Sequence, residues 1–363
     1  MQSYLPLSVV GMVALAFWAC ESTTHEAPSL PGEGEICFTP EARGVTTTSN
    51  IREFKMSAFA RIKAEWYEYD EMIMDNVLVT RRDTLSNRWE YSPAVKWPDH
   101  PVSFYAVSPA SIDVNFNPYW EHTIKYQWTP EKSSVDMLIG SKQNVLQSQG
   151  AVSFNFRHAL AKVSLKLYSS LQDDIHVHVA QASIYCVGNN GDFMFPRYDT
   201  PQDLNVGDIY DRWTVWDSNA AGFDFFTAES EDDYLYLTET PTLVGAADNF
   251  FLPIELVKYT GSGGWVSGTR IQLVCKFVKY NADGSQTVLW PNAETDRTLL
   301  APNSDYGFVR TALRDITPDN RWLPGYSYNY SVDVKNFGKN PDDMPSRGPA
   351  DLEVSCEMLN FGP

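Results

Sequence analysis

Short runs in which apolar and polar residues alternate dominate the chain from residue 36 onward, and residues typical of turns separate them. Alternation with a period of two is typical of a β-strand with one buried face, whereas long stretches of helical periodicity are scarce here. Many short strands joined by turns predict an all-β fold built from sandwiches or barrels. The predicted strands are residues 54–66, 76–81, 102–108, 122–128, 151–156, 161–168, 178–187, 234–238, 250–256, 270–280, 286–291 and 326–335.

One hairpin can be placed between residues 270–280 and 286–291. Asp283 and Gly284 lie in the turn between these two runs. Such a pair readily adopts the positive φ angles that a tight hairpin turn requires. The sequence therefore predicts that the two runs form an antiparallel pair.

The chain of 363 residues is longer than one hydrophobic core usually requires, which favours two domains. The first series of strands closes at residues 145–156, and residues 157–174 begin a new series. We expect the boundary between the two domains near residues 150–165.

The first residues have the features of an export signal. Residues 5–19 are apolar and uncharged, but this stretch is shorter than the roughly 20 residues that a transmembrane helix needs. Cys20 follows directly, and the sequence before it resembles the lipobox of bacterial lipoproteins, which predicts lipidation of this thiol. The alternative is an ordinary secretory signal that ends at a cysteine. Residues 21–35 are polar and rich in Pro and Gly, as in a tether.

An isolated strand is predicted at the end of the chain. Leu352, Val354, Cys356 and Met358 alternate with polar residues, behind a run rich in Gly, Pro, Asp and Asn at 335–349. No neighbouring segment offers a hairpin partner, so this strand either completes the second domain's own sheet or pairs with another chain. The predicted organisation is a signal peptide at 1–19, a tether at 20–35, β-sandwich domains at 36–157 and 158–335, and a linker with a terminal strand at 336–363.

Charge and cysteine content exclude several classes of function. The chain has 28 Lys and Arg against 46 Asp and Glu, a net charge of −18, so nucleic acid is not an expected partner. The five cysteines form no CxxC or Cys/His spacing, which leaves a zinc site without support. Cys186, Cys275 and Cys356 lie in strand-like runs, where we interpret them as small buried hydrophobic residues.

No motif predicts catalysis or a bound cofactor. A Gly-x-Ser-x-Gly turn, a His-Glu-x-x-His helix and a phosphate-binding loop are all missing from the sequence. His176 and His178 could form a metal-binding pair, but no third ligand can be assigned, and we interpret them as the solvated face of a strand. The acidic residues 229–233 lack the spacing of an EF-hand and are interpreted as a solvated loop. We therefore expect no enzyme activity, no metal and no cofactor.

Three stretches together resemble the fimbrillin-like family, the subunits of type V pili. Residues 88–109 match its Trp-x-Tyr-x-Pro strand, Trp-Pro corner and Phe-Tyr-Ala strand. Residues 150–167 are similar to its Phe-x-His-x-x-Ala-Lys-Val pattern at the domain junction, and residues 322–334 to a Pro-Gly-x-x-Tyr strand near the end of the second domain. These motifs identify a fold and locate no reacting site.

The resemblance implies two tandem transthyretin-like Greek-key β-sandwich domains in a lipoprotein precursor. In that family an Arg-directed protease removes the first strand, and a terminal strand from the next subunit fills the groove that opens. Carried over to this chain, the resemblance implies lipidation at Cys20 and cleavage after Arg43, with Arg52 as the next possibility. The implied groove-filling side chains of the donor strand are Leu352, Val354, Cys356 and Met358.

The implied function is that of a structural pilus subunit at the cell surface, anchored to the outer membrane by its lipid and contributing to adhesion. Its partners would be other pilus subunits. The alternative is a pilus-tip adhesin, or a surface lipoprotein, that binds a glycan or host protein without polymerising. For this alternative the candidate stacking platforms are Trp213, Trp216 and Trp265; we expect the first two in the core and Trp265, between glycines, at the surface.

Overall fold

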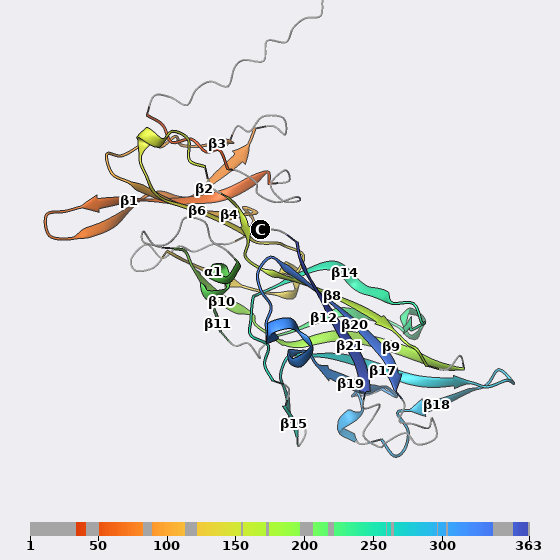
Figure 1. Ribbon diagram of the computed structural model, residues 1–363. Helices are drawn as coiled ribbons and strands as arrows, with labels where there is room; N and C mark the ends of the chain where they lie inside the picture. The colour runs from red at the N-terminus through yellow and green to blue at the C-terminus, as the bar shows by residue number, and fades with distance from the viewer. Residues whose placement is uncertain are drawn as a thin grey trace, which may run out of the picture.

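The computed structural model confirms the all-β prediction, with strands running through both parts of an elongated molecule (Figure 1). Within the described part of the chain, the one α-helix is the short α1, Val206–Asp211. The tandem transthyretin-like arrangement stays a prediction. The structure describes residues 34–40, 51–82, 89–112, 122–153, 155–171, 174–196, 206–216, 221–258, 260–262, 265–295, 297–302, 304–336 and 351–361.

A six-stranded sheet forms the first part of the molecule, in the order β3-β2-β1-β4-β6-β7. Its central strand β4 is buried along its whole length, because apolar residues cover both faces of the sheet. Phe54 and Phe104 belong to the core on one face, whereas Phe59 and Tyr105 belong to a second core that continues into the rest of the chain. The strands are β1 Glu53–Lys63, β2 Glu68–Arg81, β3 Trp89–Tyr91, β4 Val102–Ser108, β6 Leu138–Val145 and β7 Arg157–His158.

A three-stranded sheet joins the two parts. Strand β5, Thr123–Gln127, pairs with β10, Asn190–Met194, which pairs in turn with β11, Trp213–Trp216. This sheet contains strands from both sides of the boundary predicted at residue 157. The division into domains at 36–157 and 158–335 stays a prediction.

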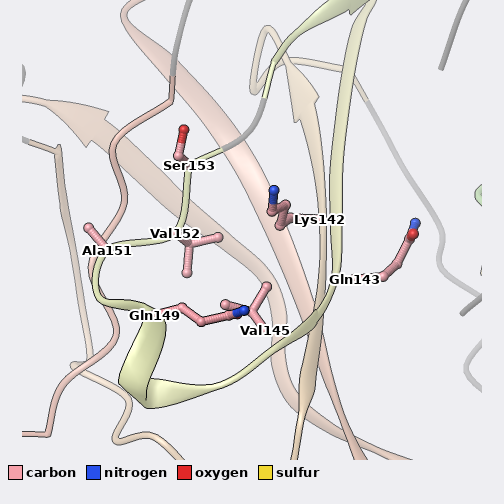
Figure 2. Close-up of a pocket in the computed structure, with 7 residues that line it drawn as sticks. All are labelled: Lys142, Gln143, Val145, Gln149, Ala151, Val152 and Ser153. Atoms are coloured by element: carbon pink, nitrogen blue, oxygen red, sulfur yellow. The ribbon is translucent and has the colours of Figure 1, made fainter. Parts of the chain in front are cut away.

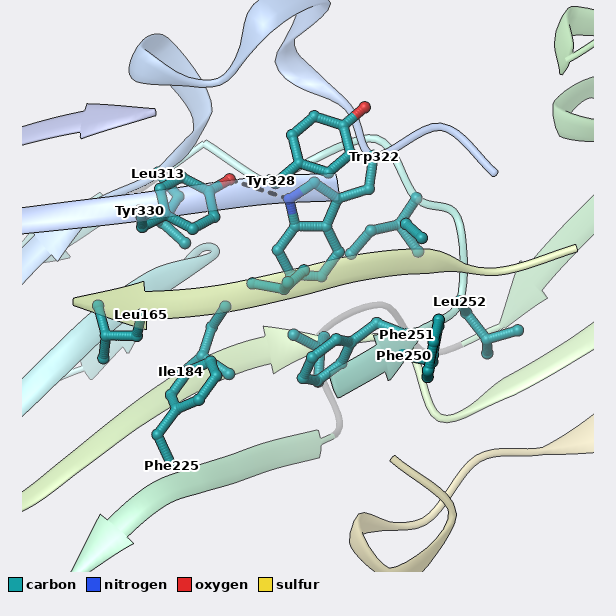
Figure 3. Close-up of a cluster of buried hydrophobic side chains, with 14 of the residues drawn as sticks. Leu165, Ile184, Phe225, Phe250, Phe251, Leu252, Leu313, Trp322, Tyr328 and Tyr330 are labelled. Atoms are coloured by element: carbon teal, nitrogen blue, oxygen red, sulfur yellow. Dashed lines mark hydrogen bonds between the residues drawn. The ribbon is translucent and has the colours of Figure 1, made fainter. Parts of the chain in front are cut away.

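Two larger sheets enclose the core of the second part (Figure 3). The first has the order β12-β9-β17-β18, with β13 also paired to β9 and β19 to β17, and the second has the order β14-β8-β20-β21. The first sheet consists of β9 Ile175–Val187, β12 Ala221–Thr227, β13 Leu235–Tyr236, β17 Arg270–Tyr280, β18 Gln286–Trp290 and β19 Gly307–Ala312. The second consists of β8 Ala161–Tyr168, β14 Thr242–Phe251, β20 Tyr326–Asn336 and β21 Asp351–Asn360.

The remaining elements are short. Strands β15, Thr260–Ser262, and β16, Trp265–Ser267, form a small separate hairpin. The 3₁₀ turns are η1 Pro130–Lys132, η2 Gln147–Gln149, η3 Glu231–Asp233, η4 Arg297–Leu299, η5 Arg314–Ile316 and η6 Pro318–Asn320.

The predicted hairpin around Gly284 is confirmed, and one predicted strand is wrong. Strands β17 and β18 pair antiparallel, and Gly284 has a φ of 82° in the turn between them. The described residues 151–153 and 155–156, in contrast, form no continuous strand, because their pairing is limited to isolated bridges such as that of Val152 with Phe38. The segment connects β6 to β7 of the same sheet and meets residues 34–40 on the way, which a local alternation cannot reveal.

Candidate functional site

The segment Gly34–Pro40 is inserted between two other parts of the first sheet's core. On one side, the Ile36 amide donates to the Val95 carbonyl at 2.9 Å, and the Trp97 amide donates to the Gly34 carbonyl at 2.8 Å. On the other side, the Val152 amide donates to the Cys37 carbonyl at 2.8 Å. The segment therefore has the hydrogen bonds of a short strand with a neighbour on each side.

The inward side chains of this segment, Ile36 and Phe38, are each only 2% exposed. The Phe38 ring centroid lies 5.4 Å from that of Tyr91 and 5.8 Å from that of Phe104, and the Tyr91 hydroxyl donates to the Ile36 carbonyl at 2.8 Å. Burial raises the pKa of Tyr91. Full burial of each apolar side chain stabilises the fold by about 1.5–3 kcal/mol. The segment thus closes this core, and its departure would leave a hydrophobic groove.

A cavity of about 240 Å³ lies beside the inserted segment, next to Val152. Strand β6 pairs with β7 only at Leu138 and Ile139. The later residues of β6 therefore have no β7 residue beside them, and the cavity lies between them and residues 149–153. Figure 2 shows the lining residues, which are Lys142, Gln143, Val145, Gln149, Ala151, Val152 and Ser153. The pocket therefore borders Val152, whose backbone pairs with the inserted segment.

The terminal strand β21 occupies the edge of its sheet and pairs antiparallel with β20 of the same chain. The predicted alternation is present: Leu352, Val354, Cys356 and Met358 are half-buried against the core, and the polar residues between them are exposed. Burial raises the pKa of Cys356 to about 11. In this single chain, the strand thus completes its own sheet, which is one of the two pairings expected for it.

The end of β21 is fixed where the two parts of the molecule meet. The Phe361 amide donates to the Gly325 carbonyl at 3.1 Å, and its ring centroid lies 4.5 Å from that of His158. The Lys162 ammonium lies 4.8 Å from the centre of the same ring. His158 is itself held 2.6 Å from a carboxylate oxygen of Asp136, and burial raises the pKa of that carboxyl.

Comparison with known proteins places this geometry in a family. Residues 44–244 match the family model described as fimbrillin-like. This chain belongs to the fimbrillin-like family. A fimbrial protein from Bacteroides vulgatus has a similar structure, with 12% identity, a TM-score of 0.52, and coverage of 90% of this chain and 99% of that one. A fimbrilin from Porphyromonas gingivalis matches with 10% identity, a TM-score of 0.44, and coverage of 90% and 97%. No curated protein matches the sequence.

Two of the sites expected in this fimbrillin-like chain, Cys20 and Arg43, lie outside the described residues. Their assignments stay predictions. None of the helices in the described ranges is long and apolar enough to cross a membrane.

The candidate metal and acidic sites have structural roles instead. Within the described ranges, no group of three or more His, Cys, Asp or Glu side chains could hold a metal ion. The interpretation of His178 as solvated is wrong: it is 5% exposed, because Tyr236 of β13 packs 4.5 Å from its ring and the Tyr280 hydroxyl of β17 lies 3.4 Å from its Nε2. Burial lowers its pKa to about 4.

The acidic turn at 229–233 is exposed and is closed by hydrogen bonds from Ser230 to the Asp233 carboxylate.

The candidate tryptophan platforms divide as follows. Trp213 is buried and donates from its indole nitrogen to the Ala159 carbonyl at 3.0 Å, whereas Trp216, expected in the core, is 54% exposed. Trp265 lies in β16, but its side chain is outside the described part. The most exposed tryptophan among the described residues is Trp66, which sequence reasoning assigned to the end of a strand. The signal in the sequence was the aromatic cluster Trp66, Tyr67 and Tyr69, which begins at the end of the predicted strand 54–66 and precedes the predicted strand 76–81.

Proposed function

We propose that this fimbrillin-like protein is a structural subunit of a cell-surface pilus, exported as a lipoprotein and assembled by donor-strand exchange. Family membership supports the role in a pilus. The observation that carries the assembly mechanism is the inserted segment 34–40, which has hydrogen-bond partners on both sides and two fully buried side chains. A segment of this kind can be replaced by a strand of similar pattern from another subunit.

Proteolysis after Arg43 would separate the inserted segment from the rest of the chain. Its loss would leave Val95, Trp97 and Val152 with backbone groups that the segment now satisfies. Unpaired backbone groups next to an open apolar groove are unfavourable and offer an edge for a new strand. The family match begins at residue 44, directly after the proposed cleavage site.

Strand β21 has the features of a donor. Its half-buried side chains alternate with exposed ones, as Ile36 and Phe38 alternate with the more exposed Cys37. As an edge strand it has one neighbour, β20, whereas the segment it would replace has two. Transfer into the groove of another subunit would therefore add a second set of backbone hydrogen bonds and bury further apolar surface.

Lipidation at Cys20 would hold the precursor at the outer membrane until it is processed. Other pilus subunits would then be its partners, and the assembled fimbrium its location. The alternative is a tip adhesin or solitary surface lipoprotein that binds a glycan or host protein without polymerising.

The decisive experiment uses protein that begins at Glu21, treated with an Arg-specific protease and analysed on unboiled SDS gels. We expect cleavage after Arg43 to produce an SDS-resistant ladder of polymers. Arg43→Ala should abolish both the cleavage and the ladder, whereas Arg52→Ala should leave them intact. N-terminal sequencing of the products identifies the cut.

A matched pair of variants on β21 tests the donor strand. Val354→Asp places a charge on the inward face and should abolish the ladder, whereas Ser355→Asp places the same charge on the exposed face and should not. Circular dichroism confirms that each monomer is folded. A ladder from Val354→Asp would contradict the proposed donor. A cleaved, folded wild-type chain that forms no ladder would contradict polymerisation and favour the alternative.

A further inference from the structure

The tip of the β1–β2 hairpin carries a cluster of exposed aromatic side chains. Trp66 is 87% exposed, Tyr67 64% and Tyr69 44%. The hairpin extends away from the rest of the molecule (Figure 1), and its turn is closed by a hydrogen bond from the Ala64 amide to the Tyr67 carbonyl at 2.9 Å. Large aromatic side chains in such a place add little to the core, and grouped exposure of this kind marks interaction sites.

The register of the hairpin aligns part of this cluster on one face. Tyr69 lies opposite Ile62, and Glu71 lies opposite Ala60. Because side chains alternate along a strand, Tyr67, Tyr69 and Glu71 share that face. The Tyr67 and Tyr69 ring centroids are 5.7 Å apart, with an angle of 36° between the ring planes. The face thus presents two neighbouring rings followed by an exposed carboxylate.

Side chains on the opposite face of the hairpin form ion pairs with one another and with the rest of the molecule. Glu68 accepts a hydrogen bond from Arg61 and lies 3.4 Å from the Lys63 ammonium. Asp70 lies 3.2 Å from Nε2 of the buried His122. Glu65 and Glu71, in contrast, form no ion pair with any other described residue. The two basic residues of the tip thus pair with Glu68. The exposed Glu65, next to Trp66 in the chain, and the exposed Glu71, two residues after Tyr69, are available to a ligand.

Aromatic faces and carboxylates both attract cations. The same chain uses this combination internally: the Lys276 ammonium lies 4.5 Å from the centre of the Tyr306 ring and 3.5 Å from a carboxylate oxygen of Asp305. At the hairpin tip, no cation of the described residues lies over the rings, because Arg61 and Lys63 pair with Glu68 instead. The charge of the tip therefore selects a positively charged ligand.

We propose that the hairpin-tip surface, formed by Glu65, Trp66, Tyr67, Tyr69 and Glu71, binds arginine and lysine side chains of a basic segment in another protein. The net charge of −18 disfavours a second copy of this chain as the occupant. Anionic membranes and nucleic acids are disfavoured for the same reason. Binding at the hairpin tip would not depend on strand exchange, because the tip contains none of the donor or groove residues.

Binding can be measured by fluorescence anisotropy with the full chain and a labelled peptide of alternating arginine and serine. Replacing Trp66, Tyr67 and Tyr69 together by alanine leaves the net charge unchanged, and we expect affinity to fall by about tenfold or more. Trp216→Ala removes another exposed tryptophan and should leave affinity within about twofold. Melting curves verify the fold of each variant.

Paired charge variants separate local binding from general attraction to an acidic protein. Glu65→Gln with Glu71→Gln should weaken peptide binding by at least about threefold more than Glu231→Gln with Asp232→Asn, which removes the same charge from another exposed turn. Equal peptide binding by the triple-alanine variant and the wild type would overturn the proposal. Binding of neutral cellohexaose that requires Trp66, without preference for the peptide, would overturn it in favour of a carbohydrate site.

Discussion

Three polar side chains in the interior of this fimbrillin-like protein bind one another. The Trp322 indole donates to the Tyr330 hydroxyl at 2.9 Å (Figure 3). The Thr317 hydroxyl lies 2.6 Å from the same oxygen. Burial raises the pKa of Tyr330, so the phenol stays neutral and takes part in both hydrogen bonds. A buried hydroxyl without these partners would cost about 1–3 kcal/mol.

His178 makes stability depend on pH. Burial, followed by the charges of Lys276 and His176, lowers its pKa from 6.5 to about 4 in the folded protein. The unfolded chain binds the proton of this histidine more readily than the folded protein does. The stability that the neutral His178 contributes is therefore fully present above pH 6.5 and is lost progressively as the pH falls towards 4. We expect the urea midpoint of the wild type to fall between pH 7 and pH 5 more steeply than that of His178→Gln. His100→Gln is the control, and an unchanged slope in the His178 variant would contradict this role.

At the scale of elements, burial on one or both faces determines the pattern of each strand. Strand β4 is buried throughout because cores lie on both of its faces, whereas the edge strand β21 alternates because only one face meets the core. Strand β14 is irregular: its register with β8 shifts between Val244 and Asn249. Gly245 lies in this irregular stretch with a φ of 70°, directly beside the Phe225 carbonyl of β12.

Two glycine variants separate backbone strain from steric contact. A Cβ at Gly245 would lie 2.3 Å from the Phe225 oxygen, whereas a Cβ at Gly284, with a similar φ of 82°, would meet nothing within 4 Å. Gly284→Ala should therefore lower the free energy of unfolding only by the strain of a left-handed residue, about 1–2 kcal/mol. We expect Gly245→Ala to lower the free energy of unfolding by clearly more in urea titrations. Equal costs would show that β14 can move away from β12.

At the scale of the whole molecule, the two parts share one hydrophobic core. Tyr105 and Trp128, from the first part, belong to the same cluster as Phe251 and Trp322, from the second. The Trp128 indole stacks on Phe251 with centroids 5.1 Å apart and donates to the Phe250 carbonyl at 2.8 Å. The pairing of β5 with β10 adds a shared sheet to this contact.

This shared core predicts a single unfolding transition. If one part unfolded, the other would lose the apolar contacts and the strand partners that the first part supplies. The two parts should therefore unfold together. Urea curves followed by circular dichroism and by tryptophan fluorescence should coincide. Separate transitions, or a stable fragment of residues 158–335, would contradict this coupling.

The all-β class, the hairpin at Gly284, the alternation of β21 and the family can be predicted from the sequence, because these depend on local periodicity and on motifs within short stretches. The folded structure was needed to show that β21 pairs with β20 in this chain, that residues 34–40 are hydrogen-bonded on both sides, and that His178 is buried. It also decided that the aromatic residues at 66–69 extend from a hairpin tip. These features depend on contacts between segments far apart in the chain, and alternation specifies which face of a strand is apolar without specifying what covers it.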